Sequence, residues 1–128
     1  MQSPTGTVES FLVWRLTGGR SHVSDVTNAS RTLLLDIGSC AWSDAMCARF
    51  RVPRAVLPRV VACDAQVGDC EASLFGRAIP IAGMAGDQQA ALVGHGCLER
   101  GMAKATFGTG AFLVMNTGAA RRHSANRL

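Results

Sequence analysis

Asp87 is the residue whose type and position in this chain of 128 residues most favour catalysis. It follows a run of small residues and precedes Gln88, at a point where a strand is expected to give way to a helix. Open α/β folds bind ligands at the carboxyl ends of their strands. A carboxylate there can accept the proton of a substrate hydroxyl, and a neighbouring amide can hold a second hydroxyl. The other interpretation is that Asp87 only caps the helix and Gln88 occupies its first turn.

A second candidate site is the turn formed by Gly108, Thr109 and Gly110 between two strand-like runs. Glycines let a ligand approach the backbone N–H groups without obstruction from a Cβ atom, and the Thr109 hydroxyl could contact a phosphate. The same residues also suit an ordinary hairpin in which the glycines supply positive φ angles. Neither a GxGxxG fingerprint nor a GxxxxGK[ST] loop occurs in the chain, so the turn is not a known dinucleotide or Walker motif.

The sequence predicts no metal site and no disulfide framework. His95 and Cys97 flank a glycine but lack further ligands at usable spacing. The cysteines are odd in number and contain no CxxC pair, so buried, reduced thiols are expected. There are five of them: Cys40, Cys47, Cys63, Cys70 and Cys97.

The composition is that of a globular protein, with 48% hydrophobic and 17% charged residues. The net charge of +4 comes mainly from scattered arginines, and the chain has no Tyr and only 5% aromatic residues. A basic face interleaved with stacking aromatics, which nucleic-acid binding needs, is therefore not indicated. No stretch approaches the ~20 apolar residues of a membrane span, and the N-terminus lacks the pattern of a secretory signal. We expect a cytoplasmic protein that binds neither nucleic acid nor a membrane.

Helices and short strands must position the candidate residues. Before residue 59 the patterns predict a capped helix over 7–17, a polar loop over 21–31, a short buried element at 33–35, a helix over 43–52 and a turn at 53–58. Beyond it they predict strand or irregular chain over 59–76 with a turn at Gly68 and Asp69, a buried strand over 77–86, a helix over 88–98 and a hairpin of strands over 102–107 and 111–118. Trp14 and Trp42 are expected in the core, and a domain boundary is expected between Glu99 and Gly101.

Four segments together resemble the glycerol kinases of the FGGY-type carbohydrate kinases: GTVESFLVWRLTGG, TNASRTLLLDI, IPIAGMAGDQQAALVG and GMAKATFGTGAFLVMNTG. The similarity is collinear from about Gly6 to Gly118. The TNASRT and AGDQQAA segments are similar to glycerol kinases in particular, because sugar-specific relatives vary there. The resemblance implies an α/β architecture of the RNase H-like type found in actin and hexokinase. In that architecture residues 1–100 are the C-terminal part of the first kinase domain, and residues 101–128 are the truncated start of the second.

The resemblance also implies an activity, the ATP-dependent phosphorylation of glycerol to sn-glycerol 3-phosphate with Mg²⁺, in a parent protein that is homo-oligomeric. Asp87 matches the family's catalytic base and a substrate contact, and Gln88 matches a residue that hydrogen-bonds the polyol. Phe112 matches the aromatic residue that packs on the glycerol carbons. The ATP contacts of the second domain fall on Gly108, Thr109 and Gly110.

Two departures from the family pattern are mild packing changes: Phe107 stands where Tyr is usual, and Ala111 stands where Cys is common. The family's first phosphate hairpin, an Arg-Glu pair that binds glycerol and the adenosine-binding segment have no counterpart in the sequence. We therefore expect an internal fragment that is inactive by itself, marginally stable and prone to associate. The alternative is a non-catalytic remnant that binds a polyol or a partner protein.

Overall fold

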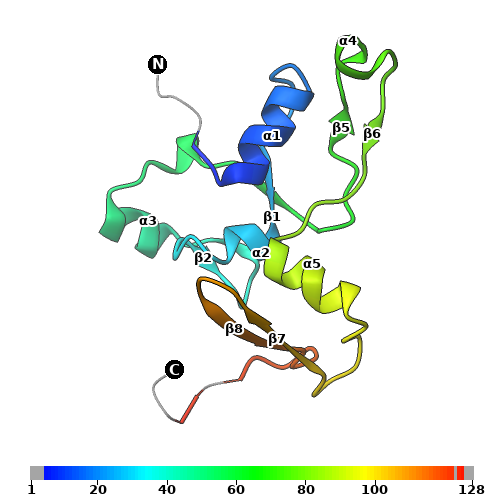
Figure 1. The fold of residues 1–128 in the computed structure, drawn as a ribbon. Coiled ribbons are helices and arrows are strands. Elements are labelled where there is room, and N and C mark those ends of the chain that lie inside the picture. The colour runs from blue at the N-terminus through cyan, green and yellow to red at the C-terminus, as the bar shows by residue number, and fades with distance from the viewer. Residues whose placement is uncertain (1–4, 123, 126–128) are drawn as a thin grey trace. The chain divides into compact units, whose positions relative to one another are not determined.

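The computed structural model describes residues 5–122 and 124–125, which form a mixture of helices and short strands (Figure 1). The chain divides into two compact units, a first unit that ends at Ala85 and a second unit that begins at Gly86. The domain boundary expected between Glu99 and Gly101 is a different division of the chain and stays a prediction.

The first predicted helix is confirmed as α1, Val8–Leu16, with Thr7 at its N-cap. The large apolar residues Phe11 and Leu12 are exposed, however, and the buried residues of the helix are Ser10 and Val13. The helix packs against the strand β1, Val23–Asp25, through this small face, because small side chains allow a close approach. The spacing of the large apolar residues therefore predicted the helix but not its buried face.

The prediction of a polar loop over 21–31 is wrong. This segment contains β1 and the short helix α2, Val26–Ala29. All three residues of β1 are buried, and the strand pairs in parallel with β4, Arg59–Val61. Its polar residues are satisfied internally, since the Ser24 hydroxyl donates to Glu9 Oε1 over 2.6 Å. A buried strand with hydrogen-bonded polar side chains has the composition of a loop, and this explains the error.

The next elements follow the prediction more closely. The strands β2, Leu35–Asp36, and β3, Ala41–Trp42, form an antiparallel hairpin, and the helix α3 spans Asp44–Phe50. The Ser43 hydroxyl caps α3 by accepting from the Met46 N–H over 3.3 Å, as expected. A single 3-10 turn, η1, follows at Arg54–Val56, as predicted.

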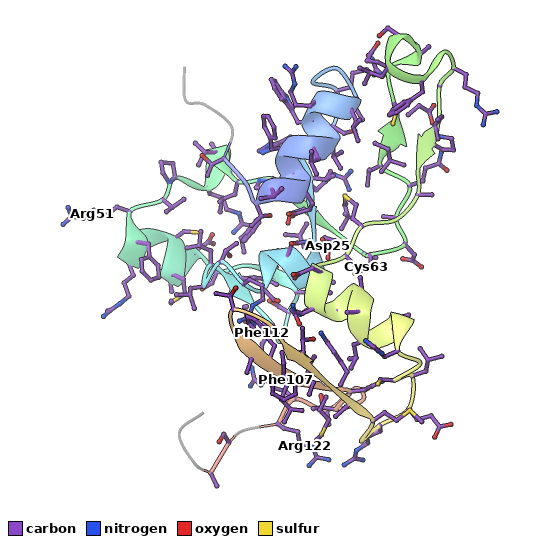
Figure 2. The ribbon with its side chains drawn as sticks, viewed as in Figure 1. Asp25, Arg51, Cys63, Phe107, Phe112 and Arg122 are labelled. Carbon is purple, nitrogen blue, oxygen red and sulfur yellow. The ribbon has the colours of Figure 1, made fainter. Side chains whose placement is uncertain are left out.

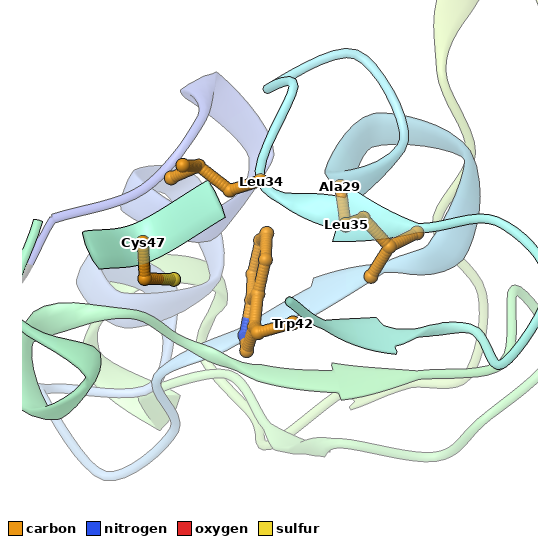
Figure 3. Packing of buried hydrophobic residues seen from close by; sticks show 5 residues of the cluster. All are labelled: Ala29, Leu34, Leu35, Trp42 and Cys47. Carbon is orange, nitrogen blue, oxygen red and sulfur yellow. The ribbon is translucent and has the colours of Figure 1, made fainter. Parts of the chain in front are cut away.

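Two hydrophobic clusters form the core of the first unit. The first joins the β2–β3 hairpin to the helices α2 and α3: Ala29, Leu34, Leu35, Trp42 and Cys47 (Figure 3). Trp42 lies in the core as predicted, and its indole N–H donates to the Pro58 carbonyl over 2.7 Å. The same prediction is wrong for Trp14, which is exposed. Leu33 is exposed at a φ of 64°, so only part of the buried element expected at 33–35 is buried. The second cluster gathers around the β1–β4 pair: Val13, Val23, Val61 and Val67.

The region between β4 and the end of the first unit differs from the prediction. Gly68 and Asp69 form the strand β5 rather than a turn, and β5 pairs antiparallel with β6, Pro80–Ile81. The connection between them contains the helix α4, Ala72–Phe75. The buried strand expected over 77–86 is reduced to β6, because its alanine and glycine neighbours bury little apolar surface. In β6, Pro80 is exposed and Ile81 is half-buried against the second hydrophobic cluster.

The second unit contains the helix α5, Asp87–Gly94, and the antiparallel strands β7, Ala103–Phe107, and β8, Ala111–Met115. The helix and the hairpin are confirmed, but the helix ends at Gly94 rather than at residue 98, and the second strand ends at Met115 rather than at residue 118. α5 packs against β8. None of the helices in the described residues is long and apolar enough to cross a membrane.

All five cysteines are free thiols, as expected, but they are not all buried. Cys47, Cys70 and Cys97 are buried, whereas Cys63 is half-buried. Cys40 is exposed because it lies in the turn between β2 and β3, with a φ of 53°.

Candidate functional site

Asp87 is the first residue of α5, and its carboxylate is exposed. The N-cap position belongs to Gly86, whose carbonyl accepts the first helical hydrogen bond from the Ala90 N–H over 2.8 Å. The interpretation of Asp87 as the cap residue is therefore wrong. Its Oδ1 atom does accept from the Gln88 N–H over 2.8 Å, which satisfies one of the free donors at the helix start. The negative charge is favoured at this end of the helix by the helix dipole.

Gln88 lies between the carboxylate of Asp87 and an ammonium group. Its side-chain Nε2 donates to Asp87 Oδ2 over 3.3 Å, and its Oε1 accepts from Lys104 Nζ over 2.6 Å. The two residues predicted to contact substrate are thus hydrogen-bonded to each other. Lys104, on β7, holds the side chain of Gln88.

Lys104 is the residue of this site that the sequence analysis missed. Its ammonium is buried and also donates to the Thr106 hydroxyl over 2.7 Å. Lys104 and Thr106 are two residues apart on β7, so their side chains leave the same face of the strand. The available signal was composition, because Lys104 is the single lysine among the 13 Lys and Arg residues of the chain.

The turn between β7 and β8 does not need glycine for its backbone conformation. Neither Gly108 nor Gly110 has a positive φ, so the interpretation based on positive φ angles is wrong here. A Cβ atom at Gly108 would meet nothing within 4 Å, which leaves the backbone open to a ligand. A Cβ atom at Gly110 would lie 3.1 Å from the Phe112 ring, so this glycine makes room for the phenylalanine. Thr109, between the two glycines, is exposed.

Phe112 and Phe107 lie on the hairpin (Figure 2). Phe112 is opposite Thr106 in the strand register and is half exposed, with 51% of its surface accessible. The hydrogen bonds described above connect Asp87 and Gln88 with Lys104 and Thr106. In the described part of the chain, no hydrogen bond joins Thr109 or Phe112 to Asp87.

A second polar cluster surrounds Asp25 in the first unit (Figure 2). The buried carboxylate accepts from the Thr27 N–H over 2.8 Å, from Asn28 Nδ2 over 2.6 Å and from the Cys63 thiol over 3.4 Å. Burial by itself raises the pKa of Asp25, but hydrogen bonds from Asn28, Thr27 and Cys63 outweigh it and lower the pKa below its usual value. Burial, together with Asp25, raises the pKa of the Cys63 thiol. The cluster ties the start of α2 to the chain after β4.

Other features of the described residues give no further site. A hollow of about 400 Å³ in the first unit is lined by residues 40–42, 54 and 57–60, and it contains none of the predicted site residues. His95 is exposed at the C-cap of α5 and Cys97 is buried. Among residues 5–122 and 124–125, no group of three or more His, Cys, Asp or Glu side chains could hold a metal ion.

Residues 3–94 match the model of the FGGY family of carbohydrate kinases, N-terminal domain. The chain belongs to the FGGY family of carbohydrate kinases. This FGGY chain is 55% identical over 123 residues to a glycerol kinase of Alteromonas mediterranea, and 57% identical to glycerol kinase 1 of Pseudomonas aeruginosa. In both comparisons 96% of the FGGY chain is matched to 25% of the relative, so the chain spans about a quarter of their length.

The fold of the FGGY chain is also that of a solved glycerol kinase. The crystal structure of Plasmodium falciparum glycerol kinase with ADP matches it with a TM-score of 0.82 and 40% identity, over 88% of the FGGY chain and 23% of the other. The expected α/β architecture, the actin- and hexokinase-like kinase fold in incomplete form, is thereby confirmed.

Proposed function

We propose that this FGGY chain is part of an ATP-dependent glycerol kinase, which converts glycerol to sn-glycerol 3-phosphate. The observation that carries the proposal is the pair Asp87 and Gln88, an exposed carboxylate hydrogen-bonded to an amide at the start of α5. The pair lies in a chain that is more than half identical to curated glycerol kinases along nearly its whole length.

Asp87 acts as the general base. Its carboxylate accepts the proton of one glycerol hydroxyl as the hydroxyl oxygen attacks the γ-phosphorus of ATP and the bond to the ADP oxygen breaks. Gln88 holds a neighbouring hydroxyl through its amide. Because phosphoryl transfer depends on positioning and on charge stabilisation, the two contacts orient the nucleophile and do little covalent chemistry.

The hairpin turn is the proposed ATP contact. ATP supplies the phosphoryl group, and Gly108, Thr109 and Gly110 would face its phosphates. The open space at Gly108 supports this assignment, because neither glycine is required by the backbone conformation of the turn. Magnesium is usually held by one or two carboxylates together with substrate phosphates, so in this proposal the metal would accompany the nucleotide.

The remaining parts of the proposal concern substrate packing and context. The half-exposed ring of Phe112 would pack on the glycerol carbons. The parent protein would be a homo-oligomer in the cytoplasm, with residues 1–100 and 101–128 in its two kinase domains. Most of the nucleotide site would come from other parts of that parent, so the 128-residue chain alone would be inactive.

The proposal can be tested in a chimaera of Pseudomonas aeruginosa glycerol kinase 1 in which this chain replaces the matched quarter of the sequence. Glycerol-dependent release of ADP is the measurement. The chimaera should be active, and Asp87→Asn should lower kcat by roughly 10²–10⁴-fold, the usual contribution of a general base. Asp64→Asn, which changes an exposed aspartate in the first unit, is the matched control and should leave kcat unchanged.

Two results would count against the proposal. A folded chimaera without activity would favour the non-catalytic remnant, and equal activity of the Asp87→Asn variant would remove Asp87 as the base. The isolated chain should form no glycerol 3-phosphate. ATP-dependent formation of this product by the chain alone, abolished by Asp87→Asn, would show that the chain needs no partner segments.

A further inference from the structure

We propose that Lys104 is a positioning residue that fixes the orientation of the Gln88 amide and so makes Gln88 a hydrogen-bond donor to the substrate. The part that concerns the substrate rests on the proposed function. The part that concerns the amide rests only on contacts inside the second unit: Lys104 Nζ to Gln88 Oε1 at 2.6 Å, and Gln88 Nε2 to Asp87 Oδ2 at 3.3 Å.

The burial of Lys104 is the first step. Only 5% of its surface is accessible, and the ammonium donates to two uncharged acceptors, Gln88 and Thr106. The ion pairs within the described residues are Arg20–Glu71 and Arg54–Asp44, so Lys104 has no carboxylate partner there. A buried charge without a counter-charge costs free energy of folding, and an apolar side chain would fill the same space at lower cost. A role in the site accounts for an ammonium at this position.

The chemistry of the amide is the second step. An ammonium can only donate hydrogen bonds and a carboxylate can only accept them, whereas the two ends of a glutamine amide do one each. Lys104 therefore admits only the orientation in which Oε1 faces it. Asp87 admits only the orientation in which Nε2 faces it. The two neighbours select the same orientation, which presents an N–H donor beside the carboxylate acceptor.

The bond lengths show which contact holds the amide and which one a substrate could replace. The bond from Lys104 to Gln88 is short and charge-assisted, which is the strong kind. The bond from Gln88 to Asp87, at 3.3 Å, lies beyond the usual range for N–H···O and is weak. A polyol could take the Gln88 N–H with one hydroxyl oxygen and give the proton of the adjacent hydroxyl to Asp87. The arrangement suits two neighbouring hydroxyl groups.

Thr106 completes the arrangement by holding the ammonium. Its hydroxyl accepts from Lys104 Nζ over 2.7 Å from the same face of β7. Two of the three ammonium donors are thereby directed by named acceptors, which leaves the group little freedom to turn away from Gln88. Thr106→Val removes the acceptor and keeps the shape of the side chain, whereas Thr106→Ser keeps the acceptor.

The first test needs no catalytic activity. Because Lys104 is the single lysine of the chain, ¹⁵N-lysine labelling of the 128-residue chain gives one side-chain ammonium signal in NMR spectra. We expect slow proton exchange of this signal, and a shift of the signal in Gln88→Ala and in Thr106→Val. Gln89→Ala, which changes the neighbouring amide, is the matched control and should not move it. A fast-exchanging signal that none of these variants moves would overturn the contact and with it the proposal.

The second test is a double-mutant cycle in the chimaera defined above. Lys104→Met should raise the KM for glycerol about tenfold, the usual effect of losing a hydrogen bond to a charged group, and leave the KM for ATP nearly unchanged. If Lys104 acts through Gln88, the variant with both Lys104→Met and Gln88→Ala should be no worse than Gln88→Ala alone. Thr106→Val should show part of the effect of Lys104→Met, and Thr106→Ser should restore it.

The outcomes separate the two proposals. Fully additive effects of Lys104→Met and Gln88→Ala in an active chimaera would overturn the role of Lys104 and leave the glycerol kinase proposal standing. An inactive chimaera would count against the glycerol kinase proposal, and the NMR signal would still decide whether Lys104 holds the amide.

Discussion

The two units differ in how they bury apolar and charged residues, although both expose large apolar side chains such as Phe11 and Phe107. In the first unit two hydrophobic clusters close around Trp42 and Val23, and the buried carboxylate of Asp25 is saturated with hydrogen bonds. In the second unit the strand β8 exposes most of its apolar side chains, and Phe107 on β7 is 84% exposed. The buried charge of the second unit, Lys104, has uncharged partners.

The buried charge of the first unit serves stability, whereas the buried charge of the second unit serves the candidate site. A buried aspartate that is surrounded by donors stabilises the fold, because its charge is compensated where it lies. A buried lysine that holds an amide beside an exposed carboxylate costs folding free energy and positions a site instead. Substitutions of buried residues in the first unit should therefore change stability, and substitutions of Asp87, Gln88 or Lys104 in the second unit should change activity.

The largest effect on stability is expected from Trp42→Ala. Trp42 is 8% exposed and packs in the first cluster, so its loss should cost about 3–5 kcal/mol of the free energy of unfolding. That is a large share of the stability of a small domain, so the variant should be mostly unfolded at 25 °C. Trp14→Ala is the matched control, because Trp14 is 36% exposed, and it should cost less than half as much. Guanidinium titration followed by far-UV circular dichroism measures the free energy of unfolding of both variants. Equal losses of stability would contradict the burial of Trp42 in the first cluster.

Asp25→Asn should have the next largest effect. The substitution keeps the shape of the side chain but weakens hydrogen bonds that a carboxylate accepts from Thr27 and Asn28, at a cost of about 2 kcal/mol. Asp64→Asn removes an equal charge from an exposed position and should stay within about 0.5 kcal/mol of the parent. Urea titration of the three proteins at pH 7 gives the comparison. A similar midpoint for all three would mean that Asp25 is not a structural anchor.

The stabilising effect of Asp25 should disappear in acid. Because the pKa of Asp25 is lowered in the folded chain, its contribution is complete above the ordinary pKa of an aspartate, about 3.9, and is lost as the pH falls through the folded value. The difference in unfolding free energy between the parent chain and Asp25→Asn should be constant from about pH 5 to pH 7 and shrink below pH 4. Urea titrations at a series of pH values measure this difference in unfolding free energy. A difference that grows in acid would mean that folding raises the pKa of Asp25 instead of lowering it.

Local signals in the sequence were sufficient to predict the elements that begin or end at capping residues or glycines. The helix capped by Ser43 and the hairpin around Thr109 lie where their patterns predicted. β1 escaped prediction because its Ser24 and Asp25 are polar but buried, which depends on partners far away in the sequence. Propensity and periodicity report neighbours along the chain, and they cannot report a hydrogen bond across 38 residues.

The candidate site was predictable only in part for the same reason. Asp87 and Gln88 are adjacent and could be read together as an acid beside an amide. Lys104 lies 16 residues from Gln88, and nothing local to either residue indicates the contact between them. Its type alone was unusual, as the single lysine in an arginine-rich chain. The structure adds Lys104, the residue that we propose sets the orientation of the predicted Gln88.

Thr109→Ala tests whether the turn serves the site or the fold. The exposed hydroxyl should contribute to ATP binding through a hydrogen bond to a charged oxygen, so the KM for ATP in the chimaera should rise about tenfold. The stability of the chain should change by less than about 0.5 kcal/mol, because nothing buried is lost. Thr109→Ser keeps the hydroxyl and should keep the parent KM. An unchanged KM with lower stability would make the turn structural.

The smallest effect on stability is expected from Leu113→Ser, and it tests the open face of the hairpin. Leu113 on β8 is 75% exposed, so the change should alter the free energy of unfolding by no more than about 0.5 kcal/mol. Leu35→Ser is the matched substitution in the first unit, where the leucine is 9% exposed, and it should cost several times more. An exposed row of apolar side chains promotes association, so light scattering should show that Leu113→Ser lowers self-association of the chain, whereas Leu35→Ser raises it by unfolding the first unit. Equal costs for the two leucines would mean that the hairpin has a core of its own and that the contrast between the two units does not hold.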